Sequence, residues 1–195
     1  TSHDTYYVYD HYGNLSFVLP PKSEPHTEKP DTTELAELCY QYVYDDLNRL
    51  VEKKIPGKGW EYIIYNKLDQ PIMTQDANLR AQNRWLFTKY DVFGRVAYTG
   101  IFVHGTTGRT YWQNFAYLYG THESRIDPGV VRRGTLIYYT SGAFPADYHQ
   151  ILTINYYDDY AFDLDGGTSE TAYGVTPITN VKGLATGSKV RVLGS

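Results

Sequence analysis

Few side chains in this sequence have types and spacings that could perform chemistry. One acidic cluster, formed by Asp158, Asp159, Asp163 and Asp165, resembles a loose calcium loop. It lacks the alternating oxygen ligands and the closing bidentate glutamate of an EF-hand, which favours a solvated turn over a metal site. No pair among the histidines has metal-ligand spacing, which predicts surface or loop positions for all of them. The six histidines are His3, His11, His26, His104, His122 and His149.

The sequence also lacks a recognisable nucleophile or phosphate loop. Ser141 is followed by Gly142 but is not part of a Gly-x-Ser-x-Gly elbow, and Cys39 has no base near it in the sequence. A cysteine in a strand is usually a small buried apolar residue. The segment 104–109 holds two glycines without Walker or GxGxxG spacing, which indicates a plain loop. We therefore predict no catalytic residue, no metal and no cofactor.

Aromatic residues leave a second kind of site open. A group of aromatic rings on one sheet face could stack on a sugar, and the candidates for this ligand platform are Trp60, Tyr62, Trp85 and Trp112, with Tyr111 nearby. Rings at alternating strand positions are more often cross-strand packing pairs. We therefore favour packing and keep glycan binding as the alternative.

Composition limits the class of protein. The chain has 195 residues, a net charge of −4 and scattered Lys and Arg residues, which argues against nucleic-acid binding. No apolar run approaches the roughly 18 residues of a membrane helix. With Cys39 as its one cysteine, the chain has no internal disulfide. Its 21 tyrosines favour β-structure with half-buried aromatic surface.

Four segments repeat a tyrosine followed by a turn. Their turn residues are Tyr9, Asp10 and Gly13; Tyr44, Asp45 and Asn48; Tyr65, Asn66 and Asp69; Tyr90, Asp91 and Gly94. A short acceptor after the tyrosine opens a type I turn by binding the backbone two residues on. Gly, Asn or Asp three positions later tolerates the positive φ that a following bulge requires. Each unit therefore predicts a hairpin, and a match at both turn positions in all four copies argues against coincidence.

The rest of the chain fits a mainly β fold with insertions. We expect one segment over 1–195, with four hairpins in 1–102, insertions at 20–38 and 76–83, and a less regular β region over 103–195. Capping residues predict short helices at 31–38, and at 76–83 with Asp76 as N-cap. Residues 111–119 fit either a helix or a strand, and we favour a helix near 108–119. Strands are expected at 136–139, 151–157 and 188–193, with a degenerate fifth repeat at Tyr157–Tyr160.

The turn motif resembles the YD repeat of Rhs-type proteins. Tyr90 to Val96 matches the pattern Tyr-Asp, two residues, Gly-Arg-Leu/Val in full, whereas the first two copies depart from it at Asn14 and Asn48 and Tyr65–Pro71 matches loosely. Further segments are similar to a Bacteroidetes branch of Rhs-like surface proteins, among them Asn48–Lys54, Trp85–Asp91 and Lys182–Gly187. The resemblance spans nearly the whole chain and is weakest over 21–31 and 103–135.

The resemblance implies a fold and a function. YD repeats are non-catalytic, and their consecutive hairpins form a curved antiparallel β-strip that closes into a shell around a C-terminal toxin in secreted or surface-displayed proteins. It implies a section of scaffold whose partners are neighbouring repeats of the full-length chain and a toxin cargo. A carbohydrate-binding module with surface glycan as ligand is the alternative, and an enzyme is the least favoured reading. No nucleic-acid partner and no membrane span are expected.

Overall fold

The protein is mainly β, with a large antiparallel sheet built from hairpins and three short helices. The computed structural model describes residues 3–105, 108–162, 175–176, 178 and 180–192. Ten strands are hydrogen-bonded in the order β1-β2-β3-β4-β5-β6-β7-β8-β11-β12, and β9 pairs with β10 in a separate two-stranded sheet. This agrees with the predicted sheet of consecutive hairpins with short helical insertions.

The elements follow the predicted repeats closely. The strands are β1 (Tyr6–Tyr9), β2 (Leu15–Leu19), β3 (Tyr40–Tyr44), β4 (Leu50–Lys54), β5 (Glu61–Tyr65), β6 (Pro71–Gln75), β7 (Arg84–Tyr90), β8 (Val96–Val103), β9 (Arg125–Arg132), β10 (Thr135–Tyr139), β11 (Gln150–Tyr157) and β12 (Ala185–Val190). The helices are the 3-10 turn η1 (Pro21–Ser23), α1 (Thr32–Glu37), α2 (Ala77–Ala81) and α3 (Arg109–Ala116).

The contacts within the chain group its residues into two compact units. Unit 1 comprises residues 1–85 and 105–113, and unit 2 comprises residues 86–104 and 114–195. The division falls within β7, after Trp85. Residues 105–113, which follow β8, also belong to unit 1. Repetition in sequence alone gives no signal for this boundary.

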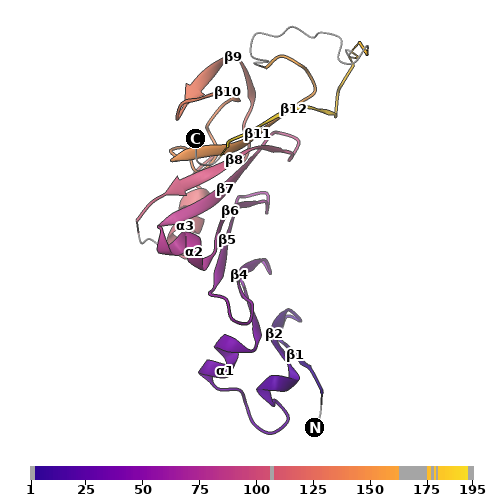
Figure 1. Cartoon of the computed structure of the whole chain (residues 1–195), viewed down its shortest axis with the longest axis vertical. Helices are drawn as coiled ribbons and strands as arrows, with labels where there is room; N and C mark the ends of the chain where they lie inside the picture. Colours follow the sequence, from indigo (N-terminus) through magenta and orange to yellow (C-terminus); the bar gives the residue numbers. More distant parts are fainter. Residues whose placement is uncertain (1–2, 106–107, 163–174, 177, 179, 193–195) are drawn as a thin grey trace. The chain divides into compact units, whose positions relative to one another are not determined.

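Unit 1 contains three successive hairpins, β1-β2, β3-β4 and β5-β6. Figure 1 shows their turns on the same side of the sheet. In each hairpin the register shifts by one residue beside the turn, as at Val8–Phe17 followed by Tyr9–Leu15. This shift is the bulge that the turn motif predicts. The link from β4 to β5 is also a turn, in which the Lys58 backbone amide donates to the Ile55 carbonyl at 3.0 Å.

The predicted helix caps are present. Asp31 accepts from the amides of Thr33 and Glu34, and the Glu34 carboxylate accepts from the Asp31 amide, which completes a capping box around α1. Asp76 accepts from the Leu79 amide at 2.7 Å and begins α2. These two local predictions are confirmed, as is the helix near 108–119. Of the described residues, none belongs to a helix with the length and hydropathy to cross a membrane.

Unit 2 buries a dense aromatic core. Phe87 packs edge-on against Tyr98 at 6.2 Å and lies 5.0 Å from the Tyr148 ring. A second stack joins Tyr139 and Tyr156, whose centroids are 5.7 Å apart and nearly parallel. Four of the 21 tyrosines are thus buried in this core, where each contributes apolar area and carries a polar hydroxyl.

Two elements differ from expectation in unit 2. Strand β9 includes Pro128 and Gly129 and lies in a segment for which no strand was predicted. Proline is tolerated there because β9 pairs with β10 alone, so one of its edges has no ladder to interrupt. The last strand is β12 at Ala185–Val190 and not 188–193, since its start is set by pairing with Tyr157 in β11.

Gly100 gives the first prediction. A Cβ at this position would collide with the Gln150 carbonyl oxygen and the Phe87 ring, and the carbonyl belongs to the paired strand β11. Gly100→Ala is expected to lower the free energy of unfolding by about 1 to 3 kcal/mol, because a packed core resists added atoms. Urea denaturation followed by tryptophan fluorescence measures the loss. Gly105→Ala, at an open position, serves as control, and equal stability of the two variants would contradict the packing.

Candidate functional site: a ladder of hairpin turns

The four predicted turns share one hydrogen-bond pattern. The side-chain oxygen of the residue after each motif tyrosine accepts from the amides two and four positions later. The acceptors are Asp10, Asp45, Asn66 and Asp91. In the last of these turns, Asp91 Oδ1 lies 2.9 Å from the amide nitrogens of both Phe93 and Arg95. The acceptor predicted from the sequence therefore bridges the whole turn.

The positive φ predicted three residues after each acceptor is also present. It measures 85° at Gly13, 59° at Asn48, 57° at Asp69 and 77° at Gly94. Each of these residues donates its amide to the carbonyl of the turn's acceptor residue at 2.9–3.2 Å. The side-chain types at the two motif positions are therefore explained by turn geometry.

A fifth turn repeats part of this construction and is split in sequence; it differs in that Asp158 itself has a positive φ of 72° and accepts from the Gly183 amide through its carboxylate. Tyr157 and Asp158 occupy the first half, as predicted, but the second half lies at Gly183 and Leu184 and not at Asp159 and Tyr160. The Asp158 amide donates to the Leu184 carbonyl at 3.1 Å, and Gly183 has a φ of 82°. Tyr157 then pairs with Ala185, as Tyr9 pairs with Leu15 in the first hairpin. An insertion therefore separates the two halves of one repeat.

Side chains that follow the positive-φ residue connect consecutive turns. In unit 1, Asn14 donates to the Asn48 side chain at 3.2 Å, and Arg49 donates to Asp69 at 2.7 Å. Arg49 also holds its own turn, since its Nε lies 2.8 Å from Asp45 Oδ2. Asn14 and Arg49 therefore each bind their own turn and the next one.

Arg95 makes the corresponding connection in unit 2. Its Nε donates to Asp91 Oδ2 at 2.7 Å within its own turn. Its two terminal nitrogens meet the two carboxylate oxygens of Asp158, at 3.0 and 2.5 Å, in the following turn. The planar guanidinium can serve two carboxylates in this way because its donors point in fixed directions. The arginine of the motif is thus a bridge between hairpins.

The motif tyrosines complete the connection. The Tyr65 hydroxyl donates to the Leu50 carbonyl at 2.7 Å, and the Tyr157 hydroxyl donates to the Val96 carbonyl at 3.1 Å. Leu50 and Val96 are the aliphatic residues that restart the strand in the preceding repeat. Partial burial raises the pKa of both tyrosines, which keeps them protonated as donors.

Each of these tyrosine rings also lies under the arginine of the preceding repeat. The guanidinium of Arg49 is 4.8 Å from the Tyr65 centroid, and that of Arg95 is 4.2 Å from the Tyr157 centroid. Such a cation–π contact is worth about 0.5–1 kcal/mol at an exposed site and more when desolvated. Tyrosine, aspartate and arginine of the motif therefore all act at the junction between hairpins.

An insertion supports one junction. The Gln113 side chain, from α3, donates to the Tyr65 carbonyl at 2.8 Å and accepts from the Tyr65 amide at 3.0 Å. The pairing of β4 with β5 covers Glu52 and Lys53 but does not extend to this position. The glutamine amide therefore takes the place of a neighbouring strand, a contact that no local pattern predicts.

The candidate ligand platform is not an exposed surface. Trp85 and Trp112 are 1% and 3% exposed, and Trp60 and Tyr62 are half-buried. The Tyr62 ring is 6.5 Å from that of Trp85 and lies 4.6 Å from the Arg80 guanidinium. Tyr62 in β5 and Trp85 in β7 are therefore packed against one another, whereas Trp112 is buried in the helix α3.

A buried ion pair lies in unit 2. Lys89 and Glu123 have fully buried side chains, and their Nζ and Oε1 atoms are 2.8 Å apart. The Lys89 ammonium donates also to Ser141 Oγ at 3.1 Å and to the Ala143 carbonyl at 2.9 Å. The Glu123 carboxylate accepts in addition from Thr140 Oγ1 and from the amides of residues 142 and 143. Both charges are thus paired and hydrogen-bonded, as burial demands.

Burial lowers the pKa of Lys89 to about 8, against the opposing attraction of Glu123. Its three N–H bonds already have acceptors, and its side chain is closed to solvent. A lysine in this setting has no proton-accepting lone pair to offer at neutral pH and no route to a substrate. The Lys89–Glu123 pair is a structural tie between β7 and the chain before β9. Because 34 residues separate the two, spacing gave no signal of it.

The remaining predicted positions are accounted for. Asp158 is bound by Arg95 and Asp159 by Arg125, while Asp163 and Asp165 lie outside the described residues. All six histidines are exposed, and Cys39 is buried, as expected. Within the part of the chain that the structure describes, no three His, Cys, Asp or Glu side chains are grouped as metal ligands would be.

Asp158 gives a prediction about acid stability. Its hydrogen bonds from Arg95, followed by the Gly183 amide, lower its pKa from 3.8 to about 2. The stabilisation from this carboxylate is therefore present above pH 3.8 and is lost as the pH falls towards 2. Between pH 5 and pH 2.5, the wild-type chain should lose more unfolding free energy than Asp158→Asn in urea denaturation. Asp46→Asn, at an exposed turn position, should behave like wild type, and equal losses in all three proteins would contradict the ion pair.

Comparison with known proteins identifies no relative, since no family model and no curated protein sequence matches this chain.

Proposed function

We propose that this chain is a non-catalytic structural and interaction scaffold, a section of the β-strip of an exported Rhs-like protein that encloses or presents a C-terminal toxin or effector. The observation that carries the proposal is that motif arginines and tyrosines form bonds between successive hairpins. Arg49 and Arg95 each bind their own turn and the next one, and Tyr65 and Tyr157 bind the hairpin before them.

Such junctions make an architecture to which further hairpins can be added. In repeat proteins the stability is close to a sum of unit terms and nearest-neighbour terms, and each unit presents the surface that the next requires. The outermost strand β1 offers such a surface, because Tyr7 and Tyr9 are both 59% exposed. A neighbouring repeat that pairs with β1 would cover Tyr9 as the β3-β4 hairpin covers Tyr65. Neighbouring repeats are accordingly the partners of this edge.

The buried ion pair supports a non-catalytic role as well. Lys89 is the titratable group whose pKa lies nearest to neutrality among those with a shifted pKa, yet it is enclosed and fully hydrogen-bonded. An active site needs its acid or base within reach of a substrate. In unit 1, the polar side chains at the turns form bonds between repeats instead.

An extension experiment tests the scaffold. A copy of residues 40–59, which comprises β3, β4 and the following turn, is joined directly to Asp4 in place of residues 1–3, so that Tyr9 follows the copy at the same distance as Tyr65 follows Gly59. If the strip accepts a further hairpin, the melting temperature should rise by about 2 to 8 °C, since one added unit contributes about 1–2 kcal/mol. Hydrogen exchange of the β1 amides should slow at the same time.

The control is the same fusion with the 20 added residues in shuffled order, which should leave both the melting temperature and β1 exchange unchanged. If the native-order copy behaves like the shuffled copy, β1 is not an edge for further repeats and the scaffold proposal fails.

A further inference from the structure

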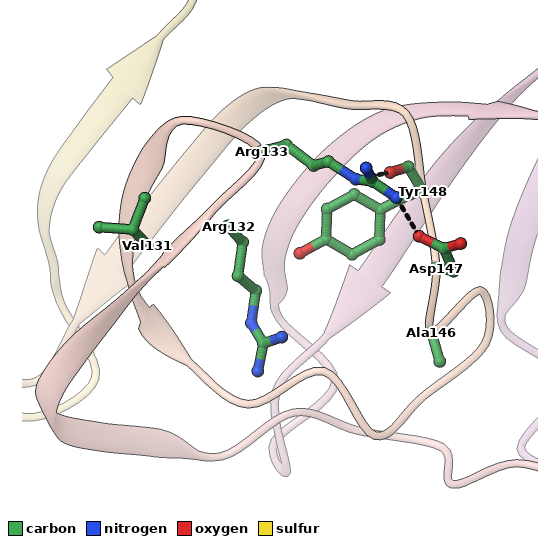
Figure 2. Close-up of a pocket in the computed structure, with 6 residues that line it drawn as sticks. All are labelled: Val131, Arg132, Arg133, Ala146, Asp147 and Tyr148. Carbon is green, nitrogen blue, oxygen red and sulfur yellow. Dashed lines mark hydrogen bonds and ion pairs between the residues drawn. The ribbon is translucent and has the colours of Figure 1, made fainter.

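Two hollows in unit 2 differ in how far their charged groups are already bound. The smaller one, of about 330 Å³, lies between the β9-β10 turn and the loop before β11. Figure 2 shows that the Arg133 guanidinium there donates to the Asp147 carboxylate and to the Tyr148 carbonyl. These groups have their partners within the chain. The larger hollow, of about 580 Å³, is lined by a charged group that has no such partner.

The larger hollow lies between the fourth and fifth turns of the ladder. Phe93 and Arg95 line it from the turn between β7 and β8, and Asp158, Lys182 and Gly183 line it from the split fifth turn. All five residues belong to unit 2. The volume falls within the range of roughly 300–1,000 Å³ that small-molecule sites occupy.

The apolar part of the lining is an exposed aromatic ring. Phe93 is 75% exposed, and the Arg95 guanidinium lies 5.0 Å from the centroid of its ring. Turn geometry explains the residue types at Asp91 and Gly94 but requires no ring between them. Covering an exposed ring with an apolar ligand removes apolar area from water and is favourable. Phe93 therefore offers a surface on which a second ring can pack.

The charged part of the lining includes one cation without an ion pair. Arg95 and Asp158 bind each other through two contacts, at 3.0 and 2.5 Å. Arg95 also binds Asp91, which is 7% exposed and does not line the hollow. Lys182 is exposed and forms no ion pair with any described residue. The pKa of Asp158 is lowered first by the Arg95 hydrogen bonds, then by the Gly183 amide, and also by the charge of Lys182. The Lys182 ammonium is therefore near this carboxylate and available to an anion.

We propose that this hollow binds a small aromatic molecule that carries one negative charge. The ligand ring packs on Phe93, and its anionic group pairs with the Lys182 ammonium. The Arg95–Asp158 pair stays closed and holds together the two turns that carry these contacts. This inference goes beyond the scaffold function and does not depend on it.

Two dyes that differ by one sulfonate group test the proposal on the full chain. Anilinonaphthalene sulfonate carries the charge, and phenylnaphthylamine has the same rings without it; both fluoresce more strongly in apolar surroundings. We expect the sulfonate dye to bind with a Kd of about 0.1 mM or tighter. Salt raised from about 0.05 to 0.5 M should weaken binding of the sulfonate dye but not of the neutral dye.

Competition separates the ring from the charge. Naphthoate should displace the sulfonate dye, and acetate at the same concentration should not, because it has no ring to pack on Phe93. Displacement by acetate would overturn the role of the ring. No fluorescence gain with either dye up to about 1 mM would overturn the site.

Variants of exposed side chains locate the binding. Lys182→Gln should weaken binding of the sulfonate dye by about three- to fivefold and leave the neutral dye unchanged. Phe93→Ala should weaken binding of both dyes by about fivefold or more. Lys67→Gln and Tyr12→Ala, at an exposed lysine and an exposed ring in turns of unit 1, are the matched controls and should bind like wild type. An equal effect of Lys182→Gln on the two dyes, or none on either, would contradict the anion. Wild-type binding of both dyes by Phe93→Ala would contradict the hollow as the site.

Discussion

Replacing Glu123 by alanine is expected to lower the free energy of unfolding by about 3 to 5 kcal/mol, the usual cost of leaving one member of a buried ion pair without its partner. The Lys89 ammonium would keep Ser141 Oγ and the Ala143 carbonyl but lose its counter-charge. The Thr140 hydroxyl and two backbone amides would lose an acceptor as well. Urea denaturation followed by circular dichroism at pH 7 measures the change.

The chain contains a matched control for this variant. Lys53 and Glu61 form a pair at 3.0 Å whose side chains are 35% and 26% exposed. Glu61→Ala should cost less than about 1 kcal/mol, because solvent screens the pair. The double variant Lys89→Met/Glu123→Leu should recover part of the loss, since both charges are then gone. A Glu123→Ala cost no larger than that of Glu61→Ala would show that Lys89 is not enclosed as described.

The second large effect is expected at the motif aspartate of the fourth turn. Asp91 is 7% exposed and binds the amides of Phe93 and Arg95 together with the Arg95 guanidinium. Asp91→Ala should cost about 2 to 4 kcal/mol, because three hydrogen bonds to a charged, buried acceptor are lost and their donors remain. Thermal and urea unfolding provide the measurement.

Asp10 is the matched position in the first turn. It makes the same bonds to the amides of Tyr12 and Asn14 but lies in an exposed hairpin with no arginine. Asp10→Ala should therefore cost clearly less than Asp91→Ala. If both substitutions cost the same, the aspartate would act through the local turn alone and the contribution of the arginine bridge would be negligible.

Local features of the fold were predictable because their causes lie within a few residues. The turn acceptors, the positive φ at Gly13 and Asn48, and the N-caps Asp31 and Asp76 each depend on bonds spanning four residues or fewer. Such bonds are fixed by residue type and spacing, so a single sequence is sufficient to find them. The mainly β class followed from the repetition of these turns.

Contacts between distant residues were not predictable in the same way. Nothing in the sequence relates Gln113 to Tyr65, or Lys89 to Glu123, because any pairing across such distances depends on the completed fold. The split fifth turn shows the limit most clearly. Its two halves, at Asp158 and Gly183, have separate local signals, and only pairing of β11 with β12 brings them together.

The sequence also left two interpretations of the aromatic residues open. Alternation along a strand places Trp85 and Tyr62 on defined faces but does not say which face is covered. The structure covers Trp85 and Trp112 almost completely and leaves Trp60 and Tyr62 half-buried.

A double-mutant cycle on Arg95 and Asp158 measures whether motif residues bind one hairpin to the next. Arg95→Ala, Asp158→Ala and the double variant are compared with wild type by urea denaturation at pH 7 and low salt. The two-point contact between the guanidinium and the carboxylate predicts a coupling energy on the order of 1 kcal/mol, reduced at high salt. Additive effects within about 0.3 kcal/mol would contradict the claim, because the arginine would then serve its own turn alone.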